Sequence, residues 1–531
     1  MKSIYVRVAA LFFLIVSSAC WTQSGAQDTK PVLKSNTRLV VVDVVATDRS
    51  GQPVSGLTAE DFTILEDRRP QKISDFSFQH PEPTLMQATL RLPPNVVSNI
   101  PPHKASSLNV VLLDTLNGDF AGHAQAQEAL IKYLETAQLT QPMAIFALQE
   151  KVVLLHDFTT DNEALKAVVQ KFRPPARTNA AESIESRASA FTTKGDFHTD
   201  NRNIEATLNG LHGLARTLGG YPGRKNVIWL SESFPLVLAP ETAVRDSISA
   251  ASIGDDGLSR VPTQFDVLQQ SNPTQDYAGL VRKVAEAMTN AQVAVYPVDS
   301  TALTKDDHLA AQHTMNNLAQ STGGKAFYNR NDLIVGLRTS LEDGATYYTL
   351  SYYPDNKKWD GKFRVITVKS ARPGVNLRYR LGYYAVDPEA AAKEESKMLA
   401  EDFSRALTLD APAITAVLFQ AGVLPPNNSG KVVVNFAIDP HTLAFEKTEN
   451  GQEHASVACV VWAFSGKGDP QRAEGNSNAD LKPDVYAQVM KTYFPCQRTL
   501  NLKSGKYTLK LGVLDRSTNH IGTTMTTVIV P

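Results

Sequence analysis

Between residues 108 and 328, short apolar runs alternate with stretches of helical pattern, and this alternation limits the folds open to the chain more than any other feature. The first run, LNVVLLD, is as apolar as a parallel strand buried on both faces must be. HAQAQEALIKYLETA follows with apolar residues at helical spacing, and NVIWLSES and QVAVYPVDS repeat the strand pattern later. Repeated alternation of this kind predicts a doubly wound, mostly parallel α/β sheet.

The segments on both sides of this region have the pattern of β structure. Strand-like runs separated by turns fill the part that precedes it, and six prolines preclude a helix through most of the following connector. At 531 residues the chain is too long for one core, so several domains are expected. We predict a signal segment at 1–26, an N-terminal β module at 37–80, a proline-rich connector at 81–106, an α/β domain at 107–335, a β extension at 336–386, a helical spacer at 387–408 and an Ig-like β-sandwich at 412–531.

The overall charge excludes one large class of partners. Lys and Arg total 53 against 54 Asp and Glu, for a net charge of -1, so no electrostatic attraction to nucleic acid or to an anionic membrane surface is expected. The basic patch interleaved with aromatic residues that nucleic-acid binding requires is not found either. The expected partners are proteins.

The N-terminus has the order of an export signal: positive charge, a short apolar run at 8–16, and then the small residues SSAC. The apolar run is too short to cross a bilayer as a mature helix. Two processing sites compete. VSSAC resembles a bacterial lipobox that would lipidate Cys20, although Ser17 replaces the usual leucine, whereas SGAQ would be cleaved after Ala26. The protein is therefore expected to be secreted, periplasmic or associated with the outer envelope, and it would attach to a membrane only if Cys20 is lipidated.

Two cysteines remain in the exported chain, Cys459 and Cys496. In an oxidising compartment a disulfide between two strands is the natural interpretation, and two buried free thiols are the alternative. Neither cysteine has a second Cys or a His at the spacing of a zinc site.

Oxygen-bearing side chains follow the first strand of the α/β region. Asp114 ends this strand, and Asn117 and Asp119 come before the next helical pattern. Glu232 follows the strand NVIWLS, and carboxyl ends of parallel strands form the functional edge of such sheets. An aspartate at this position can hold a metal ion, or it can cap the following helix and bind loop amides.

The order of strand, Asp-Thr-Leu-Asn loop, helices, PGRKNVIWLSE, AVYPVD and GG resembles a von Willebrand factor type A domain, and in particular a bacterial exported family in which VDVVATDRSGQPVSGLTAEDF and LPPNVVSN precede the domain. The resemblance covers roughly residues 37–385. It implies a metal-ion-dependent adhesion site made of an Asp-x-Ser-x-Ser loop, a threonine and a second aspartate, which together hold Mg²⁺ or another divalent cation.

In this chain the implied metal site is degenerate. Asp114 fits the first position, but Leu116 and Gly118 replace both serines, and Glu232 replaces the second aspartate. Asn117 and Asp119 could compensate, and Thr199 is the candidate threonine.

We interpret the chain as an exported, non-catalytic interaction or adhesion protein that uses this face of the α/β domain. Two alternatives stay open: a hydrolase with Asp114 and Glu232 as acid and base, and a purely structural envelope subunit. Enzyme signatures were not found. Ser231 has no evident His or Asp partner in the sequence, and His308 and His313 lack the i, i+4 spacing of a helical metal pair.

Overall fold

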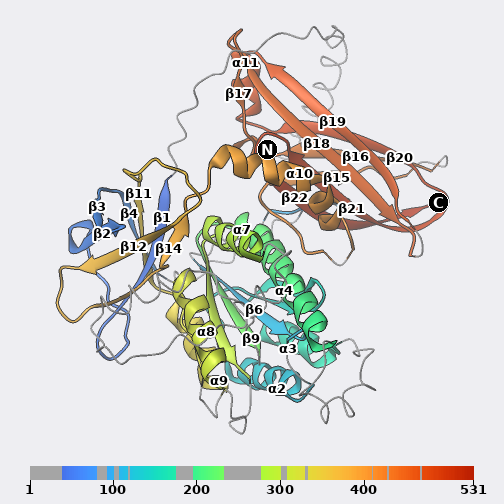
Figure 1. Cartoon of the computed structure of the whole chain (residues 1–531). Helices are drawn as coiled ribbons and strands as arrows, with labels where there is room; N and C mark the ends of the chain where they lie inside the picture. Colours follow the sequence, from blue (N-terminus) through green and yellow to red (C-terminus); the bar gives the residue numbers. More distant parts are fainter. Residues whose placement is uncertain are drawn as a thin grey trace. The chain divides into compact units, whose positions relative to one another are not determined.

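The computed structural model of the chain (Figure 1) describes residues 39–80, 92–100, 107–117, 120–174, 195–231, 277–300, 308–328, 333–409, 411–426, 430–466 and 469–531. The predicted signal segment, with Cys20, lies outside these residues. Among the described helices, none combines the length and the apolarity needed to cross a membrane.

A mixed five-stranded sheet forms the centre of the α/β region. Its strand order is β10-β9-β6-β7-β8. β6 is parallel to both of its neighbours and β9 is parallel to β10, whereas β8 runs antiparallel at one edge. The strands are β6 (Ser107–Asp114), β7 (Met143–Leu148), β8 (Val152–Thr159), β9 (Arg224–Ser231) and β10 (Val293–Asp299).

Helices cover both faces of this sheet, because successive strand residues point to opposite sides. Val110 and Leu112 of β6 pack with α4, α7 and α8, while Val111 and Leu113 pack with α2, α3 and α9. All four side chains are buried, and each contributes about 1.5–3 kcal/mol through burial. The helices are α2 (Phe120–Thr136), α3 (Asn162–Lys171), α4 (Gly195–Gly219), α7 (Tyr277–Asn290), α8 (His308–Thr322) and α9 (Leu333–Asp343).

The predicted N-terminal β module and the β extension share their sheets. β1 pairs with β11 and β2 pairs with β12, although about 300 residues separate the partners in the sequence. Val42 and Val44 of β1 are buried and face Leu350 and Tyr348 of β11, so each segment covers apolar surface that the other leaves open. The two units predicted separately therefore form one module. Its sheet orders are β13-β1-β11-β4 and β14-β12-β2-β3; the strands are β1 (Val40–Thr47), β2 (Phe62–Glu66), β3 (Arg69–Gln71), β4 (Ile73–Gln79), β11 (Tyr347–Tyr352), β12 (Phe363–Ser370), β13 (Asn376–Arg378) and β14 (Gly382–Tyr384).

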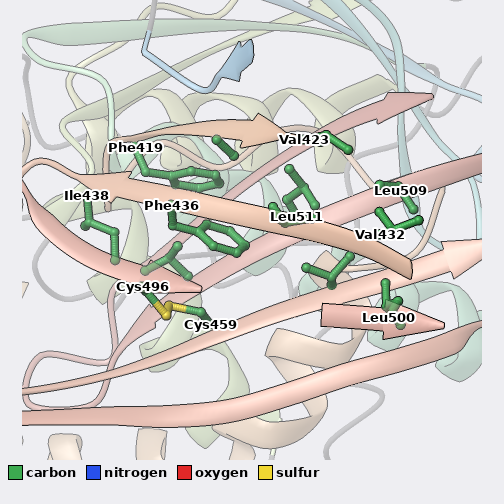
Figure 2. Close-up of a cluster of buried hydrophobic side chains, with 14 of the residues drawn as sticks. Phe419, Val423, Val432, Phe436, Ile438, Cys459, Cys496, Leu500, Leu509 and Leu511 are labelled. Atoms are coloured by element: carbon green, nitrogen blue, oxygen red, sulfur yellow. A yellow bond between two sulfur atoms is a disulfide. The ribbon is translucent and has the colours of Figure 1, made fainter. Parts of the chain in front are cut away.

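Two antiparallel sheets share one apolar core in the C-terminal region (Figure 2). One has the order β20-β16-β15-β5, and the other contains β17, β18, β19, β21 and β22. A disulfide joins Cys459 of β18 to Cys496 of β20 and so connects the two sheets. The elements are β5 (Val96–Ser98), β15 (Phe419–Val423), β16 (Lys431–Ile438), β17 (Glu446–Lys447), β18 (Glu453–Phe464), β19 (Gln471–Leu481), α11 (Pro483–Val489), β20 (Phe494–Asn501), β21 (Gly505–Asp515) and β22 (Ile521–Val530), and α10 (Pro388–Ala406) precedes them.

The predicted connector contributes β5 to this C-terminal region. The buried Asn99 fixes it there: its Nδ2 donates to the carbonyls of Ile414 and Val417 at 2.9 and 2.8 Å, and its Oδ1 accepts the amide of Phe419 at 2.8 Å. The chain thus passes from the β module to the C-terminal region, through the α/β domain, back to the β module, and again to the C-terminal region. The α/β domain is nested between two domains that are each built from separate parts of the sequence.

Candidate functional site

Asp114 lies where the order of the central sheet changes direction. β6 has β7 on one side and β9 on the other, and Asp114 and Ser231 are the last residues of β6 and β9. The next described helices after these two strands, α2 and α7, pack on opposite faces of the sheet. Such an edge is the usual place for a binding site in parallel α/β sheets.

Five donors surround the carboxylate of Asp114. Oδ1 accepts the backbone amides of Leu116 and Asn117, both at 2.9 Å. Oδ2 accepts the Nδ2 of Asn117 at 3.0 Å, the Nε1 of Trp229 at 3.0 Å and the Oγ of Ser231 at 2.8 Å. The side chain therefore closes the loop after β6 onto itself and connects β6 to β9.

Asn117 extends these contacts to helix α4. Its Nδ2 also donates to the Oγ1 of Thr207 at 2.9 Å, and Thr207 is completely buried in α4. Leu116 is half-buried and packs against the core on the same side of the sheet. Contacts with both β9 and α4 thus hold the loop that follows β6 in place.

Burial raises the pKa of Asp114 to about 6, against the opposing effect of the hydrogen bonds from Asn117, Ser231 and Leu116, which favour the charged form. Asp114 is 2% exposed and Ser231 1%, so water and substrate reach neither group in this arrangement. The cluster has the chemistry of a structural anchor: a buried anion holds three segments of backbone in place through satisfied hydrogen bonds.

The residues do not fit a divalent cation in this arrangement. A cation needs free lone pairs on the carboxylate, but Oδ2 already accepts three donors, and the indole N–H of Trp229 cannot serve as a ligand. Within the described residues no group of three or more His, Cys, Asp or Glu is placed to hold a metal ion.

The structure brings together two of the five predicted metal-site residues, Asp114 and Asn117. Asp119 and Glu232 lie outside the described residues, and Thr199 lies in α4 with its side chain outside them. The sequence interpretation missed Trp229, Ser231 and Thr207. The statement that Ser231 lacks an Asp partner is wrong, because the partner is Asp114, 117 residues earlier in the sequence.

One signal in the sequence could have identified two of these residues, Trp229 and Ser231. The positions of Trp229 and Ser231 at the end of a strand, parallel to the strand that ends in Asp114, would have placed all three at one edge of the sheet.

No protein-family model and no curated protein matches the chain. Several solved structures are similar to it. The vWF domain of the type V pili tip protein Mfa5 from Porphyromonas gingivalis is 13% identical over 44% of this chain and 94% of that chain, with a TM-score of 0.24. A von Willebrand factor type A structure from Catenulispora acidiphila is 10% identical over 89% of this chain and 75% of that chain, with a TM-score of 0.25. Proximal thread matrix protein 1 from the mussel byssus is 10% identical with a TM-score of 0.24; the match covers 45% of this chain and 48%, about half, of that protein.

These TM-scores and identities assign neither a family nor a function to this chain. The site is therefore interpreted from its own geometry.

Proposed function

We propose that the protein is an exported, non-catalytic interaction or adhesion protein, and that the face formed by the carboxyl ends of β6 and β9 binds a protein partner. The type A assignment of the α/β domain, its doubly wound topology and the Ig-like sandwich at the C-terminus belong to this proposal. So do export through the N-terminal signal segment and attachment by a lipid at Cys20, with free secretion as the alternative.

The observation that carries the proposal is the set of hydrogen bonds around Asp114. Five donors from the loop after β6 and from β9 bind Asp114 and fix the backbone at the sheet edge, and Asn117 also contacts α4. A loop held in one conformation loses little entropy when it binds, which favours recognition of a partner.

The same hydrogen bonds make a catalytic role for Asp114 unfavourable. A general base must reach the proton of a substrate or of a water molecule, but both oxygens of Asp114 already accept protein donors and the side chain is buried. We further propose that this face binds its partner without a metal ion, since the carboxylate has no lone pair left for one.

Binding through this face is tested with a charge at its exposed rim. Leu116 is half-buried in the loop after β6, and the control residue Val485 is 39% exposed on α11 of the C-terminal region. Purified wild type, Leu116→Arg and Val485→Arg would be immobilised and exposed to envelope and culture fractions of the source cells, and thermal unfolding would verify that each variant is folded. We expect Leu116→Arg to lose a protein that both others retain. Retention of every captured protein by a folded Leu116→Arg would contradict the proposed face.

The hydrolase alternative is tested separately with a panel of ester, peptide, glycoside and phosphate substrates. We expect no turnover above that of Asp114→Ala. Turnover that Asp114→Ala abolishes would replace the interaction proposal with an enzymatic one.

A further inference from the structure

The outer edge of β22 is open over half its length. At its start, Gly522 forms a bridge with Thr415, and the amide of Thr523 donates to the carbonyl of Ile414 at 2.8 Å. From Met525 to Val530 the strand pairs with β21 on one side, and no described strand pairs with it on the other. Its backbone N–H and C=O groups on that side are available to another strand.

This edge lacks the protection that the opposite edge of the same sheet has. β19 reads QRAEGNSNADL, with charged side chains at Arg472, Glu474 and Asp480, whereas β22 reads IGTTMTTVIV and contains no charge. Charged residues on edge strands oppose pairing with another chain, and uncharged β-branched residues favour it.

Two strongly exposed apolar side chains on β22 indicate what kind of strand binds along this edge. Ile529 is 71% exposed and Met525 55% exposed, the two highest values among the large apolar residues of the described chain. They lie two residues on either side of Thr527, which is also exposed on the outer face of the strand, while Val528 and Val530 face the core.

We propose that β22 pairs with β22 of a second copy of this chain, antiparallel and centred on Thr527. This register keeps outward residues opposite outward residues, as a continuous sheet requires. It places Met525 of each copy against Ile529 of the other and the two Thr527 side chains against each other. When a strand pairs with the same strand of a second copy, any charged residue near the centre would lie close to a like charge. β22 contains no charged residue, so this repulsion does not arise.

The junction covers about six residues per copy, far fewer than the roughly 20–30 residues per side of a standard stable interface. Pairing is therefore concentration-dependent, with dissociation in the micromolar range or weaker, on the order expected for small interfaces. Neither the face at β6 and β9 nor its partner takes part, so this inference and the proposed function can fail independently.

Disulfide trapping tests the register. Directly opposed Cα atoms lie about 4.5–5.5 Å apart, within the roughly 4.4–6.8 Å that a disulfide spans. Thr527→Cys would face its own copy, whereas Met525→Cys would lie about 13 Å from its own copy at about 3.3 Å per residue. Under mild oxidation we expect Thr527→Cys to form cross-linked dimer several-fold faster than Met525→Cys, although both positions are exposed. Equal rates, or faster trapping of Met525→Cys, would overturn the register.

Sedimentation velocity over a range of protein concentrations tests the pairing itself. We expect wild type to show a growing dimer fraction and Thr527→Lys to stay monomeric, because two lysines would then meet directly. Thr508→Lys is the matched control: Thr508 lies opposite Thr527 on β21, one strand inside the edge, and should dimerise like wild type. A monomeric wild type at every concentration, or a dimer that Thr527→Lys leaves unchanged, would overturn the proposal.

Discussion

Asp114 illustrates how one carboxylate can organise a face without acting on a ligand. It accepts five hydrogen bonds, including those from the indole of Trp229 and the hydroxyl of Ser231. Leu116 and Gly118 have no side-chain oxygen to offer a cation, and backbone amides and Asn117 donate to the carboxylate instead.

The titration of Asp114 gives a pH signature with a defined sign. Burial raises its pKa to about 6, above the roughly 4 of an unfolded aspartate. The folded state therefore binds this proton more tightly, so the stability it contributes is present below about pH 4 and is lost as the pH rises through about 6. Asp114→Asn cannot titrate. The unfolding free energy of wild type minus that of Asp114→Asn, from urea titrations, should fall by about 2 kcal/mol between pH 4 and 7; a rise over this interval would contradict the assignment.

Metal removal provides a second test at this residue. With the carboxylate saturated, we expect the thermal midpoint to be the same in EDTA as in millimolar Mg²⁺, Mn²⁺ or Ca²⁺. A cation at about ten times its Kd would add roughly 1.4 kcal/mol to the stability of the domain, a shift of a few degrees. Such a shift in wild type, if Asp114→Ala abolished it, would demonstrate a metal site after all.

For single residues, the sequence predicts the place in a strand or loop better than it predicts the hydrogen-bond partners. Asp114 was placed correctly at a strand end, because an apolar run that stops at an aspartate is a local signal. Its contacts with Ser231 and Thr207 were not predicted, because they depend on which strands become neighbours and on how α4 lies against the sheet. Both are decided by packing between segments about a hundred residues apart.

Among the secondary-structure elements, the disulfide between β18 and β20 makes a contribution that can be isolated. It closes a loop with a sequence separation of 37 residues, which the chain-entropy relation converts to about 4 kcal/mol. The double variant Cys459→Ala, Cys496→Ala should lose about that much stability in the C-terminal region. Hydrogen exchange should increase in β18 and β20 and stay unchanged in β6 and β9; equal exchange in all four strands would contradict a local effect.

The same scale shows what strand patterns leave open. The β-branched run of β1 indicated a strand, but its partner β11 lies about 300 residues away, and a buried run does not specify its neighbour. Within the described part of the connector, residues 92–100, no helix forms, and the short VVS segment forms β5. Helices and strands follow from local periodicity, whereas the assignment of strands to sheets depends on the whole fold.

For the whole molecule, Asn99 tests the nested path of the chain. Asn99→Ala would leave the amide of Phe419 and the carbonyls of Ile414 and Val417 without their bonds to this side chain, at a cost of about 2–4 kcal/mol. The loss of stability should appear as reduced hydrogen-exchange protection in β15 and β16, more than 300 residues later in the sequence. Ile100→Ala, at a residue 44% exposed, is the control and should change stability little. Unchanged protection of β15 in Asn99→Ala would argue against the anchoring role of this residue.

The nesting of the α/β domain also determines how the protein would carry mechanical tension. A force applied between residues 39 and 531 enters the ladder of β1 with β11 and leaves through the C-terminal sheets, so the covalent detour through the α/β domain stays slack while these ladders hold. The domain that carries the proposed binding face would therefore keep its shape under load until the pairing of β1 with β11 and that of β5 with β15 have both been lost.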